Sequence, residues 1–386
     1  MTTAEIEKEL RDAVGDMLRQ RSGIEAAAAL ADGPEDWDQS LWQELAAMGI
    51  TGLAVSEEQG GEGAGPALAA AAQEELGRRL TSVPSWSLLV AQAALDAAAT
   101  AGSAAAATWL RRTAVGEVPA AVAVGRTPDG WTAADGVRAD TGDGWTLEGR
   151  VPVVAEARTA RLLLVAAVTP GGPSLFAVDR TAEETTADGE GRCEVQPLES
   201  LDPTRPLAAV VLRQCPAELL AGPEDFPGVL RAAEHTALVM LAADAVGVAA
   251  EALDLSVEHA RTREQFGRPI GSFQAISHRC ADMLIAVESA RALVAAAAES
   301  IEAPGQDVET AVCLAAATAL EAAVTVAQGC IQVHGGMGIT WEHPAHRYLR
   351  RAKAAESLVA LPDRLRERAA GRLVESARQA VSAEAA

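Results

Sequence analysis

Two stretches of the sequence carry polar side chains in arrangements that helix packing does not explain. The first, HARTREQFGRPIGSFQAISHRCADM at residues 259–283, has a Gly-Arg-Pro-Ile-Gly break between two helical runs, with Arg261, Arg263 and Arg268 around it. The second, IQVHGGMGITWEHPAHRYLRRAK at residues 331–353, contains a glycine pair directly after a histidine. Because the chain has a formal net charge of -22, an anionic ligand must meet a local basic site. Both stretches therefore read as ligand-contacting elements.

The overall charge also limits the kinds of partner. A net charge of -22 repels nucleic-acid phosphates and anionic membranes, so binding to either is not expected. The stretch MTTAEIEKELRDAVGDML has an acidic amphipathic helix pattern without an apolar signal core, and no later run reaches the ~18 uninterrupted apolar residues that span a bilayer. We therefore expect a soluble, cytoplasmic protein.

The cysteines give no sign of a metal site. They are scattered, with no Cys-x-x-Cys pair and no Cys/His pair at metal-ligand spacing. We interpret all of them as reduced structural thiols: Cys193, Cys215, Cys280, Cys313 and Cys330. No metal ligand is predicted.

Hydrophobic periodicity divides the chain into three parts. Apolar residues recur at three- and four-residue spacing over residues 1–120, which predicts a helical domain. Over residues 121–222 the period shifts towards two between Gly, Pro and Asp turns, which predicts a small β domain. Alanine-rich helical stretches fill residues 223–386 and favour a tight bundle, because alanine lets helices approach closely. The fold class is therefore α+β.

The two C-terminal motifs, REQFGRPIGSFQAISHRCADM and QVHGGMG, resemble the C-terminal domain of the acyl-CoA dehydrogenase family. The stretch ELAAMGITGLAVSEEQGGEGAG, followed by EELGRR, is similar to that family's first domain. The resemblance covers nearly the whole chain in the order helix, strand, helix.

The resemblance implies a fold and a cofactor. Members of this family have an N-terminal helical domain, a central small β-barrel or sandwich and a C-terminal four-helix bundle, and they form tetramers with each FAD at a subunit interface. One subunit's β domain holds the isoalloxazine ring, and its neighbour's Arg-x-x-Phe and Gln-x-x-Gly-Gly segments hold the adenine and pyrophosphate. Carried over by motif, these cofactor-binding residues are Arg263, Gln265, Phe266, Gln274, Gln332, Gly335 and Gly336.

The residue types suit this implied role. A guanidinium offers paired donors to a diphosphate, and consecutive glycines let the backbone approach a ligand closely. The plainer alternative is that Arg263 caps a helix and the glycine pair is a simple turn. A histidine beside two glycines could be a base, but the resemblance places His334 within a cofactor-backbone segment, so we expect no chemical role for it. Cys280 lies on a helical stretch and is expected in the core.

The sequence departs from the family at the catalytic base. The family's reaction removes the α proton of an acyl thioester with a glutamate, while the β hydride goes to the flavin. The two places where family members carry this glutamate correspond to Ala237 and Val359, and neither side chain can accept a proton. Glu234 and Glu356 each lie three residues earlier, and we interpret both as solvated helix charges. No catalytic residue is assigned, and Glu234 is kept as a weak candidate for the base.

A second departure concerns the flavin ring. The family's β domain carries a Thr-Glu-Pro-Gly-x-Gly-Ser-Asp stretch and a Trp-Ile-Thr strand that line the ring, whereas the matching places here read VGRTPDG and RVPVVAEA. Val153, Val154 and Ala155 stand where the ring-lining strand should be. The residues that hold the ring are therefore missing.

This asymmetry predicts a subunit of a heteromeric dehydrogenase. We expect an α2β2 assembly in which a second acyl-CoA dehydrogenase-like subunit holds the ring and supplies the glutamate. The sequence is similar to subunits acting on steroid side-chain CoA thioesters in actinobacteria, with an electron-transfer flavoprotein or similar acceptor. The alternatives are a homomeric flavoenzyme that uses Glu234 as its base, and a non-catalytic scaffold with this fold.

Overall fold

The computed structural model describes residues 2–21, 37–133, 136–142, 144–181, 192–303 and 307–384. These residues fall into two compact units. Unit 1 comprises residues 1–27, 70–81 and 238–386, and unit 2 comprises residues 28–69 and 82–237. The order of elements confirms the predicted fold class: N-terminal helices, then a β region, then C-terminal helices. The domain boundaries at 120 and 222 stay a prediction.

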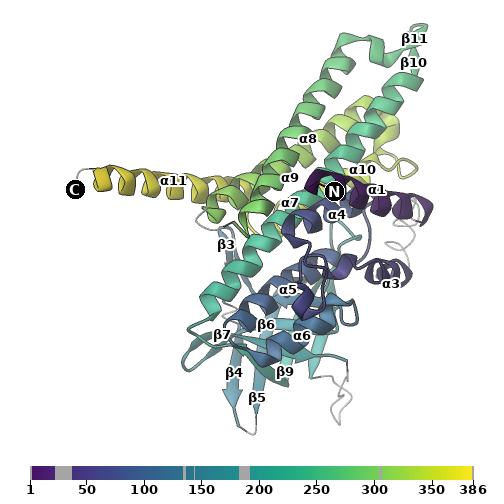
Figure 1. Cartoon of the computed structure of the whole chain (residues 1–386). Coiled ribbons are helices and arrows are strands. Elements are labelled where there is room, and N and C mark those ends of the chain that lie inside the picture. The colour runs from purple at the N-terminus through teal and green to yellow at the C-terminus, as the bar shows by residue number, and fades with distance from the viewer. Residues whose placement is uncertain are drawn as a thin grey trace. The chain divides into compact units, whose positions relative to one another are not determined.

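The described part of unit 1 is helical except for one short hairpin. Two of its helices, α4 and α7, begin in unit 2. Its elements are α1 (Thr3–Arg21), α4 (Gly65–Arg78), α7 (Phe226–Thr262), β10 (Glu264–Gln265), β11 (Arg268–Pro269), η3 (Ile270–Ser272), α8 (Gln274–Ser300), α9 (Val308–His334), η4 (Gly335–Ile339), α10 (Ala345–Ala355) and α11 (Pro362–Glu384). Helix α9 packs against α8, α10 and α11, and the β10–β11 hairpin lies at the tip where α7 ends and α8 begins (Figure 1).

Small residues let the helices of unit 1 pack closely. A Cβ atom placed on Gly247 of α7 would lie 2.0 Å from the backbone oxygen of Glu74 on α4. A Cβ atom on Gly77 of α4 would in turn lie 2.4 Å from the backbone oxygen of Asp244. Since real atoms do not approach so closely, α4 and α7 can cross here only because both positions are glycine. The tight packing predicted from the alanine content is therefore reinforced by two glycines.

A buried ion pair joins α7 to α10 beside this crossing. The Arg351 guanidinium donates from Nε to Asp244 Oδ2 at 3.0 Å and from Nη2 to Asp244 Oδ1 at 2.8 Å, with both side chains almost fully buried. Gln73 of α4 donates to the same carboxylate at 3.4 Å. The Tyr348 hydroxyl, also on α10, donates to the backbone oxygen of Arg78 at 2.9 Å. These bonds fix α10 against α4 and α7.

Unit 2 contains a small closed β-barrel. The elements of this unit are α3 (Gln39–Ala47), η1 (Ile50–Gly52), η2 (Glu57–Gln59), α5 (Ser85–Thr100), α6 (Ala104–Ala114), β1 (Ala120–Ala123), β2 (Gly125–Thr127), β3 (Gly130–Thr132), β4 (Val137–Thr141), β5 (Trp145–Ala155), β6 (Leu162–Thr169), β7 (Gly172–Asp179), β8 (Cys193–Leu198) and β9 (Leu207–Ala221). The strand order β6-β4-β5-β9-β7 closes through the pairing of β6 with β7. Strand β1 adds to β6, and β8 adds to β9.

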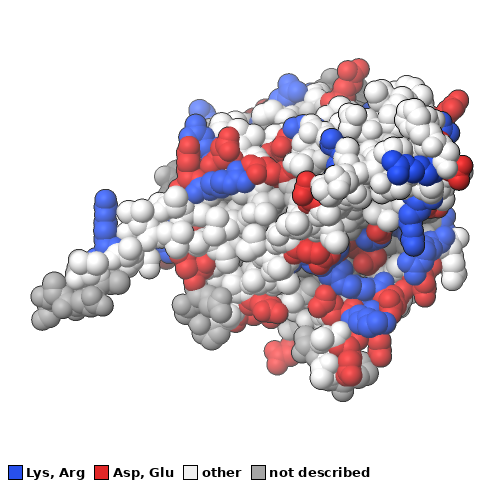
Figure 2. Space-filling view, turned by 90° about the horizontal axis from the view of Figure 1, so that it is seen from above, with Lys and Arg blue, Asp and Glu red and all other residues white. Residues whose placement is uncertain are grey.

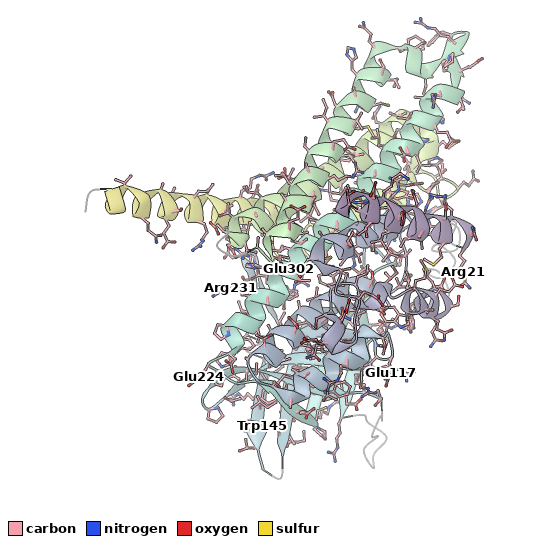
Figure 3. All side chains as sticks on the ribbon, in the orientation of Figure 1. Arg21, Glu117, Trp145, Glu224, Arg231 and Glu302 are labelled. Carbon is pink, nitrogen blue, oxygen red and sulfur yellow. The ribbon has the colours of Figure 1, made fainter. Side chains whose placement is uncertain are left out.

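The barrel core follows from the period-two pattern. Strands β6 and β7 are exceptions, since Leu162 to Ala167 on β6 and Ser174 to Val178 on β7 are buried on both faces. On β5 the pairing with β9 shifts register between Val151 and Val154, next to Pro152. Such a β-bulge bends the strand locally and turns its side chains. Figure 3 labels Trp145 at the start of β5, where its ring contacts Phe176 edge-on at 5.2 Å.

Helix α11 extends beyond the helices on which it packs. Leu365 and Ala369 in its first half are buried, whereas Leu373, Val374 and Val381 are more than half exposed. Figures 1 and 2 show this second half as an arm, and few charged side chains cover the face that Figure 2 presents. These three side chains leave part of the α11 surface apolar and exposed.

Two helices in the described part of the chain are long and apolar enough to meet the composition test for a membrane span. They are α7 and the continuous helical stretch Val308–Ile339, and the apolar windows are 94% and 72% buried within the protein. Core helices of globular proteins have the same composition. The alanine-rich pattern is thus explained by packing inside the protein.

Candidate functional site

The first predicted segment forms the connection between α7 and α8. Arg263 follows the last residue of α7, and its backbone N–H donates to the carbonyl oxygen of His259 at 2.9 Å. The N–H of Ile270 donates back to the carbonyl oxygen of Arg263 at 2.8 Å. Between them, Phe266 and Gly267 adopt left-handed backbone angles, with φ of 56° and 76°, in the turn from β10 to β11. Phe266 is 91% exposed, so this hairpin presents an aromatic ring to solvent.

The second predicted segment forms the end of α9. Gln332 lies in the last turn of α9, and Gly335 ends the helix with φ 63° and ψ -139°, a conformation that favours glycine. A Cβ atom added at Gly335 or Gly336 would meet no described atom within 4 Å, so the backbone faces open space. At Gly338 the same atom would lie 3.0 Å from the carbonyl oxygen of Ile331, because η4 folds back onto α9. The glycine pair therefore forms an exposed turn, and the close packing of Gly338 against α9 fixes the segment that follows it.

The structure brings these two segments together through histidines. The rings of His259 on α7 and His334 on α9 stack with centroids 4.3 Å apart, and the ring of His343 packs against His334 in a tilted arrangement with centroids 4.2 Å apart. This stack was not predicted from the sequence, where only His334 was considered. The available signal was that five of the six histidines lie in the two motifs: His259, His278, His334, His343 and His346.

The predicted cofactor-binding residues share one property, which is exposure at the surface of unit 1. None of them is buried: Arg263, Gln265, Phe266, Gln274, Gln332, Gly335 and Gly336. Large apolar side chains nearby in the chain are also exposed, with Ile339 at 71% and Trp341 at 70%. The arginine, the bare glycine backbone and these apolar side chains are therefore all accessible to a ligand.

Cys280 does not lie in the core as expected. Its side chain is only partly buried on α8, six residues after the helix begins at Gln274. Burial nevertheless raises the pKa of the thiol, so the thiolate form is disfavoured. Cys280 therefore lies at the edge of the helical packing, with a thiol whose deprotonation is disfavoured.

Neither position expected for a catalytic base carries one, and both positions are buried. Ala237 is fully buried on α7, where its carbonyl oxygen accepts a hydrogen bond from Trp86 Nε1 at 3.0 Å. Val359 and Ala360 are buried in the turn between α10 and α11. Glu356 pairs with Lys353 at 2.8 Å across one helical turn, which agrees with its interpretation as a helix charge.

Glu234 differs from its interpretation as a solvated charge. Its side chain is buried, and Oε1 accepts a hydrogen bond from the backbone N–H of Trp131 at 3.2 Å. Figure 3 labels Arg231, one turn earlier on α7. The β2–β3 hairpin, which carries Trp131, covers this part of α7, and nothing in the local sequence of α7 indicates that contact. The carboxylate therefore holds a hairpin in place.

The strand that should line a flavin ring presents no polar side chain at the matching positions. Val154 and Ala155 at the end of β5 are buried, and Val153 is partly buried. The next residue, Glu156, has φ 57°, its N–H donates to Pro206 O at 2.8 Å, and its carboxylate accepts from the N–H of Ser87 at 3.0 Å. Arg205 forms a buried ion pair with the same carboxylate at 3.6 Å. These groups are engaged within unit 2.

Two family models match the chain. The acyl-CoA dehydrogenase N-terminal domain matches residues 4–117, and the acyl-CoA dehydrogenase C-terminal domain matches residues 232–358. Acyl-CoA dehydrogenase IpdE2 of Mycobacterium tuberculosis is 33% identical over 381 residues, which cover 97% of this chain and 100% of that protein. The chain belongs to the acyl-CoA dehydrogenase family. The predicted family is thus confirmed, and its members are oxidoreductases that act on CH–CH bonds.

Two solved structures are similar over almost the whole chain. A variant of the Tcur3481-Tcur3483 steroid ACAD is 30% identical, with a TM-score of 0.82, covering 98% of this chain and 100% of that one. The ChsE4-ChsE5 complex from Mycobacterium tuberculosis is 28% identical, with a TM-score of 0.79, covering 99% and 98%. This chain is therefore close in sequence and fold to steroid acyl-CoA dehydrogenase subunits.

The two candidate surfaces differ in how well they fit FAD, the cofactor that the family resemblance implies. The exposed guanidinium of Arg263 and the open backbone at Gly335 and Gly336 fit a diphosphate, which needs paired donors and close backbone approach. The apolar side chains of Val153, Val154 and Ala155 offer no hydrogen bond to the polar edge of an isoalloxazine ring. The fit is good at the phosphate end and poor at the ring end.

Proposed function

We propose that this chain is one subunit of a heteromeric, FAD-dependent acyl-CoA dehydrogenase. It supplies contacts to the adenine and pyrophosphate of FAD. An unlike acyl-CoA dehydrogenase subunit holds the isoalloxazine ring and supplies the catalytic glutamate, and the expected assembly is α2β2. When bound, FAD supplies the hydride acceptor for α,β-dehydrogenation.

One observation supports this proposal: the chain has the residues for the phosphate half of the family's cofactor site but not those for the ring half. The phosphate-side residues, from Arg263 to Gly336, remain at the surface in ligand-facing turns. On the ring side, Val153 to Ala155 are apolar. The Glu156 carboxylate accepts a hydrogen bond from the Ser87 N–H and forms an ion pair with Arg205. Random loss of function would be expected to erode both halves alike. Retention of one half favours use by a partner.

The substrate class follows from the relatives. One similar structure is described as a steroid ACAD, and another as a complex of two differently named chains. We propose a steroid side-chain CoA thioester as substrate and an electron-transfer flavoprotein or similar protein as electron acceptor. We also propose a cytoplasmic location, since the five cysteines, all within the described residues, form no disulfide, as expected in a reducing compartment.

The direct test of this proposal is flavin stoichiometry. The chain purified alone is expected to contain no FAD and to oxidise no acyl-CoA, because it lacks the ring site and the base. Co-expression with a neighbouring dehydrogenase-like gene product should yield one FAD per pair of unlike chains, measured by visible absorbance against protein concentration. Two FAD per pair, or a yellow and active protein made of this chain alone, would contradict the proposal.

The alternative that Glu234 is the base makes a different prediction. Glu234→Gln keeps an oxygen that can accept the Trp131 N–H, so the hairpin should stay in place. Turnover by the assembled enzyme should therefore stay within a few-fold of the wild type. Melting temperature serves as the control for folding. If turnover instead falls by the ~10²–10⁴-fold typical of a missing general base, while the protein melts normally, catalysis belongs to this chain.

A further inference from the structure

Three stacked imidazoles connect the two segments that face the proposed cofactor. The rings of His259 and His334 are inclined by 27° at 4.3 Å, and those of His334 and His343 by 44° at 4.2 Å. These rings come from the last turn of α7, the end of α9 and the segment before α10. Three elements that are distant in sequence thus meet at His334, the residue directly before the glycine turn.

His334 is the anchor of the stack. Its side chain is 7% exposed, and Nδ1 lies 2.8 Å from the carbonyl oxygen of Cys330 on the preceding helical turn. A carbonyl oxygen can only accept, so Nδ1 carries the hydrogen and donates it. This bond orients the ring at the helix end, and a Cβ atom at Gly338 would lie only 3.1 Å from the His334 Cβ atom. The Cβ atom of His334 therefore borders the space into which η4 folds.

His343 is held in a form that accepts a hydrogen bond. The backbone N–H of Ala345, the first residue of α10, donates to His343 Nδ1 at 3.2 Å. Protonation of Nδ1 would break this bond and would place a positive ring 4.2 Å from its neighbour in the stack. The contacts of His343 thus favour the neutral imidazole.

The surroundings of His343 and His259 disfavour protonation of both rings. Burial lowers the pKa of His343 to about 4, and electrostatic repulsion from His334, His259 and His346 acts in the same direction. Burial, His334 and Arg263 likewise lower the pKa of His259. The titratable and charged groups that face the stack, or reach it through His346 or Cys330, are Arg263 after α7, Cys280 on α8, Cys330 on α9, and His346, Arg347 and Arg350 on α10.

We infer that this stack is a positioning element, which holds the Gly335–Ile339 turn and the start of the Arg263 segment in their ligand-facing conformation only while the imidazoles of His259 and His343 are uncharged. His259 reaches Arg263 through its carbonyl oxygen, which accepts the Arg263 N–H at 2.9 Å. His334 reaches the glycine turn through the chain itself. The identity of the ligand as the FAD pyrophosphate rests on the proposed function, whereas the coupling between the stack and the turn does not.

The direction of the pH effect follows from the lowered pKa values. An open stack would titrate near the ordinary histidine pKa of ~6.5, so the open form binds more protons than the closed form as pH falls below that value. The closed stack is therefore fully stabilised above about pH 6.5 and loses this stabilisation as pH falls towards the pKa of His343, which is about 4. At about pH 5, a His343 pKa lowered from ~6.5 to about 4 would shift the equilibrium about 30-fold towards the open stack. Because His343 is partly exposed, solvent screening reduces this change to roughly tenfold.

The test is hydrogen–deuterium exchange of the full-length chain, purified alone, with rates corrected for the intrinsic effect of pH. Between about pH 7.5 and about pH 5, exchange in residues 335–343 should accelerate roughly tenfold relative to the barrel strand β6. Two variants remove the titrating group: His343→Phe keeps a ring for stacking, and His343→Asn keeps an acceptor for the Ala345 N–H. Both should show a much weaker pH response. The matched control, His278→Gln on the exposed face of α8, should behave as the wild type.

Two results would overturn the inference: no acceleration in the wild type, or an unchanged response in both His343 variants. A second measurement separates it from the proposed function. Flavin retention by the co-purified unlike pair should fall over the same pH window in the wild type and less in His343→Phe. If exchange responds as expected but flavin retention does not, the positioning role stands and the assignment of the turn to FAD is wrong.

Discussion

Arg263→Ala should weaken FAD binding to the assembled enzyme by about ten- to a hundredfold. A charge-assisted and bidentate contact to a diphosphate contributes roughly 1.5–3 kcal/mol, and each 1.4 kcal/mol is about a tenfold change in affinity. The Arg263 side chain is exposed and follows the end of α7, so its removal leaves the fold of unit 1 intact. The measurement is flavin titration of the co-purified complex, with size-exclusion chromatography to show that the pair persists.

Two variants make the Arg263 result specific. Lysine at this position should restore binding only in part, because its point charge cannot form the planar, paired contact of a guanidinium. Arg261→Ala removes an exposed arginine of the same region that is not among the predicted cofactor contacts, so its effect should be several-fold smaller. Unchanged affinity in Arg263→Ala would mean that the segment is only a structural turn, and the scaffold hypothesis would then be favoured.

Arg351→Met should lower the free energy of unfolding by about 3–5 kcal/mol, the range found when one partner of a buried ion pair is removed. The loss arises because Asp244, 1% exposed, would keep its charge without the two hydrogen bonds at 2.8 and 3.0 Å. The measurement is urea denaturation of the full chain, followed by circular dichroism of the helices.

The control for the ion pair is its joint replacement. Asp244→Leu combined with Arg351→Met removes both charges, so the double variant should be more stable than Arg351→Met alone. Arg366→Ala breaks an exposed pair with Glu321, in which both side chains are 43% exposed, and should change stability by no more than ~1 kcal/mol. A double variant as unstable as the single one would show that packing of α10, rather than charge, sets the cost.

The elements with strong periodicity could be predicted from the sequence. The helices from α7 to α11 carry apolar residues at helical spacing. In the β domain the hydrophobic period shifts towards two in segments that are bounded by Gly, Pro and Asp turns. The closure of the barrel could not be predicted, because the pairings of β4 with β6, of β5 with β9 and of β7 with β9 join segments that are distant in the sequence. Local pattern carries no information about such pairing.

The same limit applies to the candidate site. The family resemblance of the two motifs supplied the predicted cofactor contacts, including Arg263 and Gly335, and that assignment stays a prediction. Glu234 was interpreted as solvated because its helical neighbours do not reveal the β2–β3 hairpin that covers it. The histidine stack escaped prediction for the same reason: His259 and His334 belong to different helices. Residue types and their spacing can be read from the sequence, whereas contacts between distant segments cannot.

Because the predicted cofactor contacts are exposed, selection for cofactor affinity and selection for stability act on different residues, although these two constraints usually conflict. The interior that folds unit 1, including Asp244 and Arg351, does not involve Arg263, Phe266 or the glycine pair. Substitutions of exposed side chains on that surface, such as Arg263, can therefore change cofactor affinity without a trade-off against stability. Conversely, under the proposed function the barrel of unit 2 can drift in sequence to suit packing alone, since it does not have to present polar groups to a flavin. A chain with this arrangement can specialise as a supporting subunit while keeping a robust fold.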